Sequence, residues 1–307
     1  MDSEYEWLVY FFELLSSGLT KGSIYALIAL GYTMVYGIVG LINFAHGEVY
    51  MVAAFVGLIV SSVLSILGFN VIAILFITLT FAVVYAAAYG YTIEKVAYRP
   101  LRQASRLSPL ISAIGMSIFL REYVILVQTP DFLSFPALIP EIPLPESLLQ
   151  FIYPSELLII VSSFLIMAVL FIFIKRTKIG KAMRSIAQDR EMAMLVGVNT
   201  DRIISATFMI GSGLAAFGAI LIANHIGQIN FNIGFIVGIK AFTAAVLGGI
   251  GSIPGAALGG LILGLVESFA TGYISSDYED VFAFSLLVLI LIFRPSGLLG
   301  KAENTKV

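Results

Sequence analysis

Residues 71–93 read VIAILFITLTFAVVYAAAYGYTI and contain no charged side chain. A helix that crosses the hydrocarbon core of a bilayer needs about 20 predominantly apolar residues, and this run meets that length. It lies in a chain of 307 residues, of which 59% are hydrophobic and 12% charged, with a mean hydropathy of +1.01. Soluble domains carry about 25% charged residues, so this chain has too few to cover the surface of a water-soluble protein. The sequence therefore predicts an integral membrane protein.

Similar apolar runs recur along the chain and predict an all-α, polytopic protein with about eight membrane helices. Long apolar runs favour helices over a β-barrel, because barrel strands are only about 9–11 residues long and alternate between apolar and polar side chains. We take 1–307 as a single transmembrane domain. The predicted spans are 23–39, 49–67, 71–93, 109–127, 157–174, 203–223 and 281–293, and a further apolar segment, 241–271, is too rich in glycine to be one plain helix.

Composition and charge exclude several other classes of protein. A net charge of −2 offers no basic surface to nucleic acid, and a chain without cysteine has no disulfide framework. The hydrophobic content excludes a disordered chain. No Lys or Arg precedes Lys21, whereas a secretory signal begins with basic residues. We therefore expect the acidic start of the chain to be retained, as an interfacial or partly inserted helix.

The charged residues alternate between two sets of connecting segments. All but three of the 17 basic residues lie at 95–106, 175–202 and 294–306, and acidic residues occupy the alternate segments 2–13, 131–156 and 277–280. Cytoplasmic loops of membrane proteins carry the excess of Lys and Arg. We therefore expect a multi-pass protein of the cell (inner) membrane, with a cytoplasmic C-terminus and an external N-terminus.

Two long connections are candidates for contact with other proteins. The external loop 128–155 is acidic and rich in proline, which disfavours helix, and it is either a stiff connector or a docking surface for an external partner.

The cytoplasmic loop 175–202 contains an amphipathic helix with Ile186 and Leu195 on its apolar side, and Gly197 can end it. Asn199 or Thr200 can cap the next span. The helix in this loop is either a docking site through which a soluble partner moves the membrane domain, or a membrane-surface helix that only anchors the loop.

Two glycine-rich stretches interrupt the apolar pattern, at 37–48 and at 247–255. They form a weak internal repeat: when Ile42 is laid on Ile250, Gly47 falls on Gly255, and a helix of small residues follows each stretch. The alternation of spans makes the two repeats parallel. Irregular backbone within a bilayer is tolerated where protein buries it or where it lines a cavity, and paired interrupted segments are typical of a transport pathway. The alternative is that these glycines only pack helices closely.

Charged side chains near these stretches extend the candidate pathway, because ionisable residues inside a membrane are costly and usually functional. Lys240 and Glu267 flank the second stretch and are expected to pair. His46 and Glu48 follow the first, and for them the alternative is a place in the headgroup region, closing the turn. The pathway candidates are Asn43, His46, Gly47, Glu48, Lys240, Gly248, Gly249, Gly251, Gly255 and Glu267.

The sequence contains no catalytic or metal-binding constellation. Gly-Lys occurs only at 180–181 and 300–301, each time followed by Ala, so no phosphate-binding loop G-x-x-x-x-G-K-[ST] is present. His46 and His225 are the only histidines. We expect neither an enzyme nor a chain that binds a cofactor of its own. A stand-alone ion-coupled secondary transporter or channel for small amphipathic solutes remains an alternative, with Glu48, Glu267 and His46 at its coupling-ion site.

Five stretches of the chain are long and specific enough to compare with known families, namely 22–37, 42–48, 94–100, 110–117 and 240–255. Together they resemble the LivH-type permeases of high-affinity branched-chain amino-acid ABC importers. The resemblance implies a permease that moves leucine, isoleucine, valine or related hydrophobic solutes by alternating access. It also implies an assembly with a second, homologous permease in a heterodimer, two cytoplasmic ATP-binding subunits that hold ATP and Mg, and an external substrate-binding protein.

The cytoplasmic loop is similar to the EAA loop by which such permeases dock on their ATP-binding subunits. Glu191-Met192-Ala193, followed by Gly197, carries this likeness, although Met192 stands where the motif has alanine and the later I-x-L-P part is absent. The residues that this resemblance assigns to coupling are Gly180, Arg184, Glu191, Ala193 and Gly197.

Overall fold

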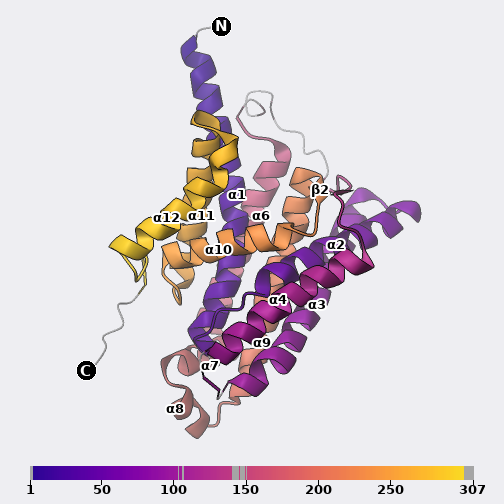
Figure 1. The fold of residues 1–307 in the computed structure, drawn as a ribbon. Coiled ribbons are helices and arrows are strands. Elements are labelled where there is room, and N and C mark those ends of the chain that lie inside the picture. The colour runs from indigo at the N-terminus through magenta and orange to yellow at the C-terminus, as the bar shows by residue number, and fades with distance from the viewer. Residues whose placement is uncertain are drawn as a thin grey trace. The chain divides into compact units, whose positions relative to one another are not determined.

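The computed structural model describes residues 3–102, 104–105, 107–139, 145, 149 and 151–300, and the side chains from Tyr5 onward. Within this part the chain is almost entirely helical (Figure 1). Several residues used in the charge and loop predictions lie outside it, namely Asp2, Arg106, Glu141, Glu146, Lys301 and Lys306. Residues 140–144, 146–148 and 150 of the predicted external loop 128–155 also lie outside the described residues, and its two interpretations stay open.

The described residues form eleven α-helices and one short two-stranded sheet. The helices are α1 Ser3–Val39, α2 His46–Ile66, α3 Val71–Ile93, α4 Leu107–Val127, α6 Pro154–Arg176, α7 Lys178–Gln188, α8 Arg190–Leu195, α9 Thr200–Ile226, α10 Ile233–Gly248, α11 Ile253–Tyr273 and α12 Glu279–Phe293. A π-helical turn, η1 Glu94–Tyr98, and a 3-10 turn, η2 Arg99–Leu101, continue α3, and a second 3-10 turn, η3 Ser276–Tyr278, precedes α12. In the sheet, β1 Leu133–Ser134 pairs antiparallel with β2 Gln228–Ile229.

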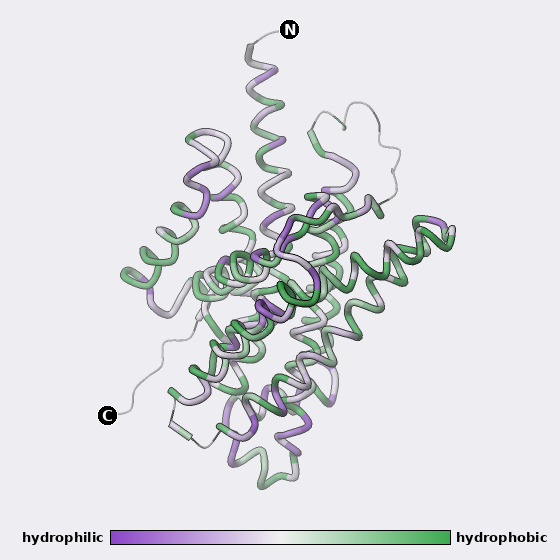
Figure 2. Tube along the Cα trace, turned by 45° about the vertical axis from the view of Figure 1, so that its right-hand side comes forward, coloured by the Kyte–Doolittle hydropathy of each residue, from purple (hydrophilic) through white to green (hydrophobic). Residues whose placement is uncertain are grey.

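The predicted all-α, polytopic membrane fold is confirmed. Seven helices of the described chain are long and apolar enough to cross a membrane, and α10, with 16 residues, is a shorter apolar helix. Figure 2 shows these helices as mostly hydrophobic, with hydrophilic residues gathered in the connections between them. The glycine-dense segment 241–271 is broken into α10 and α11, as its composition indicated.

The start of the chain is one long helix. The acidic segment, predicted as an interfacial or partly inserted helix, and the predicted span 23–39 are continuous in α1, which runs without a break for 37 residues. No proline lies between Ser3 and Val39, and Gly18 and Gly22 occur where α1 packs closely against another helix, so neither of them interrupts it.

The chain forms two compact units, and it passes from one to the other within α1, α6 and α10. Unit 1 comprises residues 1–33, 141–165 and 240–307, and unit 2 comprises residues 34–140 and 166–239.

Unit 2 is built around α2, α3 and α9, which pack against one another. Asn70 caps α3, since its side chain accepts a hydrogen bond from the Ala73 backbone N–H at 2.8 Å. Small residues let the helices approach: a Cβ at Gly90 would lie 2.3 Å from the Ser212 hydroxyl oxygen on α9. This close packing holds the end of α3 against α9, where the polar cluster described below lies.

Unit 1 contains a seam of small residues between α1 and α11. A Cβ at Gly264 would lie 2.2 Å from the backbone nitrogen of Gly22, and one at Gly260 would lie 2.3 Å from that of Ala26. The seam is continued by a hydrogen bond from the Ser268 hydroxyl to the Leu14 carbonyl at 2.6 Å. Small residues four apart on both helices bring the two backbones together, as is typical of membrane helix pairs.

Candidate functional site

The first predicted break lies in unit 2, where α1 ends and α2 begins. Gly40 has a φ of +72°, and α2 starts at His46. Asn43 is buried in the turn, and its side-chain oxygen accepts a hydrogen bond from the Tyr98 hydroxyl at 3.1 Å. Tyr98 belongs to η1, so the turn before α2 is fixed to the segment that follows α3.

His46 and Glu48 are both buried by protein, and both interpretations, a place in the pathway or in the headgroup region, stay open. The Ser117 hydroxyl of α4 donates to Glu48 Oε1 at 3.1 Å, while Glu48 Oε2 has no hydrogen-bond partner among the described residues. Gly47 brings α2 against the start of α10, because a Cβ there would lie 2.3 Å from the Gly234 carbonyl oxygen. These candidates therefore form a tightly packed, partly unsatisfied polar group.

The second predicted break lies in unit 1, between α10 and α11. Gly249 and Gly251 have φ values of +103° and +91°, which other residues rarely adopt. Ser252 then caps α11, and its hydroxyl accepts from the Gly255 backbone N–H at 3.2 Å. Gly248 lies directly against Gly255, where a Cβ would come within 1.9 Å of the Gly255 carbonyl oxygen. Close packing accounts for Gly248, Gly249 and Gly255, and the positive φ accounts for Gly251. Their predicted role in the pathway stays a prediction.

At both breaks, the helix that follows starts at nearly the same position of the internal repeat. Laying Gly47 on Gly255 places His46 on Pro254. α2 begins at His46, and α11 begins one residue earlier, at Ile253. In both places the chain turns at a glycine with positive φ before the helix begins.

Lys240 and Glu267 pair, as expected, within a larger buried cluster in unit 1. Lys240 Nζ lies 3.3 Å from Glu267 Oε1, 2.9 Å from Glu279 Oε1 and 2.8 Å from Asp280 Oδ1. The Tyr25 hydroxyl donates to Glu267 Oε2 at 2.8 Å. Lys21 adds a second cation, 3.3 Å from Glu279 Oε2. The Lys240 side chain is 5% exposed and that of Glu267 is 0% exposed, so the cluster joins α1, α10, α11 and α12 through charges withdrawn from the surface.

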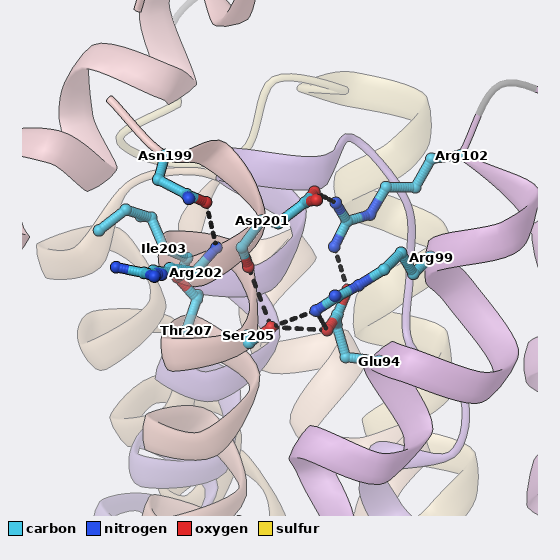
Figure 3. Close-up of polar contacts among 9 residues, drawn as sticks. All are labelled: Glu94, Arg99, Arg102, Asn199, Asp201, Arg202, Ile203, Ser205 and Thr207. Atoms are coloured by element: carbon cyan, nitrogen blue, oxygen red, sulfur yellow. Dashed lines mark hydrogen bonds and ion pairs between the residues drawn. The ribbon is translucent and has the colours of Figure 1, made fainter. Parts of the chain in front are cut away.

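A second charged cluster, in unit 2, was missed by sequence reasoning, which placed its arginines in a solvated basic loop. Glu94, at the start of η1, is fully buried and accepts hydrogen bonds from Arg99 Nη2 at 2.7 Å and from the Ser205 hydroxyl at 2.7 Å (Figure 3). Arg102 also donates to Glu94, and its other nitrogen donates to Asp201 Oδ1 at 2.5 Å. The available signal was a single acidic residue at the head of the basic stretch 94–102.

The predicted coupling loop also lies in unit 2 and contains two short helices. We expected one amphipathic helix, but Asp189 adopts an extended conformation between α7 and α8, and its side chain caps α8 by accepting from the Met192 backbone N–H at 2.9 Å. The prediction of one helix is therefore wrong, because a strong N-cap residue stands in its middle.

Gly180 and Arg184 fix α7 to the end of α6. A Cβ at Gly180 would lie 2.2 Å from the Ile174 carbonyl oxygen, and Arg184 donates to that same oxygen. Ala193 is the buried residue of α8, and Glu191 is exposed. Gly197, with a φ of +88°, ends α8, and Asn199 caps α9 by accepting from the Arg202 backbone N–H at 3.0 Å. The two ends of the segment are thus rigidly attached to α6 and α9.

The tip of this segment carries an exposed apolar surface. The exposed fractions are 80% for Leu195 and 76% for Val196, and Met192 and Met194 are also exposed. A six-residue helix with this many uncovered apolar side chains has the character of a contact surface.

Comparison with known proteins decides the family. Residues 14–291 match the family described as branched-chain amino acid transport system, permease component. The chain belongs to this permease family. It is 49% identical over 304 residues to the high-affinity branched-chain amino acid transport system permease protein BraD of Pseudomonas aeruginosa, covering 98% of this chain and 99% of BraD. It is 48% identical over 309 residues to LivH of Escherichia coli K12, with the same coverage. No solved structure matches the chain.

Membership in the permease family bears on the alternatives raised by the sequence. The family is described as the permease component of a transport system, and the relatives that match are named as transport permease proteins. Membership does not favour a stand-alone ion-coupled transporter or channel. Among the described residues of this permease, no group of three or more His, Asp or Glu side chains could hold a metal ion.

Proposed function

We propose that this chain is the membrane permease subunit of an ATP-binding cassette importer that carries branched-chain amino acids into the cell by alternating access. The observation that carries the proposal is the identity of 48–49%, over almost the full length, to permeases named for high-affinity branched-chain amino acid transport. Both compact units act together in this proposal as one permease domain over residues 1–307, in keeping with a family match that extends through both of them.

The proposed assembly contains a second, homologous permease, two cytoplasmic ATP-binding subunits and an external substrate-binding protein. ATP and Mg are bound by the ATP-binding subunits, a division of labour supported by the lack of a phosphate-binding loop in this chain. The basic segments face the cytoplasm, the N-terminus is external and the C-terminus is cytoplasmic, in keeping with the distribution of Lys and Arg.

The α7–α8 segment is the proposed docking site for an ATP-binding subunit. Its exposed apolar tip, at Met192, Met194, Leu195 and Val196, supports this role, because such a surface becomes favourable when a partner covers it. Its anchored ends support the transmission of force, since α7 is fixed to α6 through Gly180 and Arg184.

The translocation pathway is proposed to follow the two helix breaks and the buried charges beside them. Glu48 supports this assignment through its buried carboxylate oxygen, which no described hydrogen-bond donor reaches. Lys240 and Glu267 then act as an ion pair that keeps α10 and α11 in register while the helices rearrange.

Reconstitution tests the function. The chain, co-expressed with its genomically neighbouring permease and ATP-binding subunits, is placed in liposomes with the binding protein outside and ATP inside. Leucine uptake is expected only when both ATP and the binding protein are present. Leucine uptake by the purified chain alone, driven by an ion gradient, would instead support the stand-alone transporter.

Co-purification tests the docking site in the same assembly. Leu195→Ser and Glu191→Lys are expected to reduce the ATP-binding subunits recovered with the permease. The matched control is Ile66→Ser, which replaces an exposed apolar residue at the end of α2 and is expected to leave recovery unchanged. Equal recovery for all three variants would refute the docking assignment.

A further inference from the structure

The buried cluster around Glu94 joins the end of the coupling segment to the end of α3. It begins where α3 continues into the π-helical turn η1. A π-helical turn accommodates an extra residue in a helix and is frequently found at functional sites. Here the turn carries Glu94, fully buried, together with Tyr98, whose hydroxyl contacts Asn43 in the turn before α2.

Arg102 is the centre of the connection. One nitrogen of its guanidinium donates to Glu94 and another donates to Asp201, while its side chain is only 5% exposed. A guanidinium is planar and presents its donors in a fixed fork, so it holds two carboxylates in a defined relative position. Glu94 is also held by Arg99 and by the Ser205 hydroxyl.

Asp201 lies where the coupling segment ends. It is in the first turn of α9, two residues after the cap Asn199 and four after Gly197, which ends α8. Its side chain is 54% exposed, so Arg102 holds it from one side only. α7 and α8 both pack against α9, so a displacement of the segment acts on this first turn of α9.

We propose that the Arg102–Asp201 bridge is the positioning element through which movement of the α7–α8 segment reaches α3 and, through Tyr98, the first helix break. Asp201 and Arg102 are positioning residues in this proposal, and neither contacts the transported solute. The inference rests on the proposed function, because it requires an ATP-binding subunit to move α7–α8. The competing explanation is a static brace that only stabilises the cytoplasmic ends of α3 and α9.

The first measurement is leucine uptake per ATP hydrolysed by the reconstituted importer. Asp201→Asn keeps the shape of the side chain but removes its charge, and it is expected to lower this ratio by about fivefold or more, the scale of coupling between distant sites. ATP-binding subunits should still co-purify at the wild-type level. Asp201→Glu, which restores the carboxylate, should recover most of the ratio.

The matched control is Arg202→Gln. Arg202 lies on the same turn of α9, but Figure 3 shows its guanidinium pointing away from Glu94 and Arg102. This variant removes a charge without touching the bridge and is expected to keep the wild-type ratio. An equal loss in Arg202→Gln would overturn the proposal, because the effect would then belong to the charge of this turn in general.

A double-mutant cycle separates the bridge from two independent contributions. Arg102→Gln, Asp201→Asn and the double variant should all lower the ratio to a similar extent, because breaking either end breaks the same connection. Losses that multiply in the double variant would contradict a shared route. Wild-type uptake per ATP in Asp201→Asn would overturn the proposal outright.

A readout that does not use the solute separates this proposal from the proposed function. Amide hydrogen exchange is measured in the whole complex, with and without a non-hydrolysable ATP analogue. Exchange at residues 190–197 should respond to the analogue in wild type and in Asp201→Asn, whereas exchange at 94–102 should respond only in wild type. If leucine is not transported but this pattern holds, the solute assignment fails and the bridge stands. A response at 94–102 in Asp201→Asn refutes the bridge.

Discussion

The two buried charge clusters have opposite centres. In unit 2 a carboxylate, Glu94, is surrounded by two guanidinium groups and a hydroxyl. In unit 1 an ammonium group, Lys240, is surrounded by three carboxylates. A guanidinium has several fixed donors and is weakly hydrated, whereas an ammonium is a compact, strongly hydrated charge. The unit 2 cluster is therefore fixed in its geometry, and the unit 1 cluster depends more on its single central charge.

The clusters differ also in how far their other charged side chains are exposed to solvent. In unit 2, Arg99 is 33% and Asp201 is 54% exposed, so each can be solvated when the cluster is broken. In unit 1, Glu267 is fully buried, and its counter-charge is Lys240. Removing one partner of a buried pair leaves an uncompensated charge, which costs more than the pair contributed. Removing the central charged group of the cluster should therefore lower the free energy of unfolding more in unit 1 than in unit 2.

The largest effect is expected for Lys240→Met, which leaves the Glu267 carboxyl in the interior without its cation. We expect the free energy of unfolding to fall by about 3–5 kcal/mol, measured by thermal unfolding of the purified permease in detergent. Adding Glu267→Gln to Lys240→Met should restore part of the loss, because the remaining pair of groups is neutral. A Lys240→Met variant as stable as wild type would show that the cluster contributes little to stability.

A smaller effect is expected for Glu94→Gln. The amide still accepts from Ser205, Arg99 can turn to solvent, and Arg102 keeps its bond to Asp201, so the variant loses mainly the charge-assisted part of the hydrogen bonds. We expect a loss of about 1.5–3 kcal/mol, measured in the same way. Ser205→Ala is the matched control, since it removes a neutral partner of the same carboxylate. A loss as large as that of Lys240→Met would contradict the comparison.

These clusters also show what the sequence can and cannot predict. Six of the seven predicted spans, both helix breaks and the Lys240–Glu267 pair were predictable, because long apolar runs, glycine clusters and isolated charges in a membrane each have a direct physical meaning. The predicted span 281–293 lies in α12, which has 15 residues and is not among the described helices long enough to cross a membrane. The Glu94 cluster was not, since a basic stretch next to a predicted span has the ordinary appearance of a solvated cytoplasmic loop. Its burial depends on η1 and on packing against α9, more than 100 residues away in the chain.

The coupling segment shows the same limit on a smaller scale. Its amphipathic pattern and the cap at Asn199 were visible in the sequence, but the break at Asp189 was not used, although aspartate is a strong N-cap residue. The burial of Glu48 and the contact of Gly47 with Gly234 also required the structure, because they depend on how α10 packs against α2.

The smallest effect is expected for Lys21→Gln, at the rim of the unit 1 cluster. Lys21 lies 3.3 Å from Glu279, and both side chains are about a quarter exposed. Partly exposed ion pairs contribute at most about 1 kcal/mol, so the unfolding midpoint should fall only slightly. This difference between Lys21→Gln and wild type should shrink further in about 1 M salt, where the screening length falls to about 3 Å. The effect of Lys240→Met should persist in the same salt, because ions do not reach a buried pair. Equal salt sensitivity in the two variants would mean that Lys240 is as accessible to ions as Lys21. It would contradict the distinction between a buried ion pair at Lys240 and a partly exposed, salt-screened pair at Lys21.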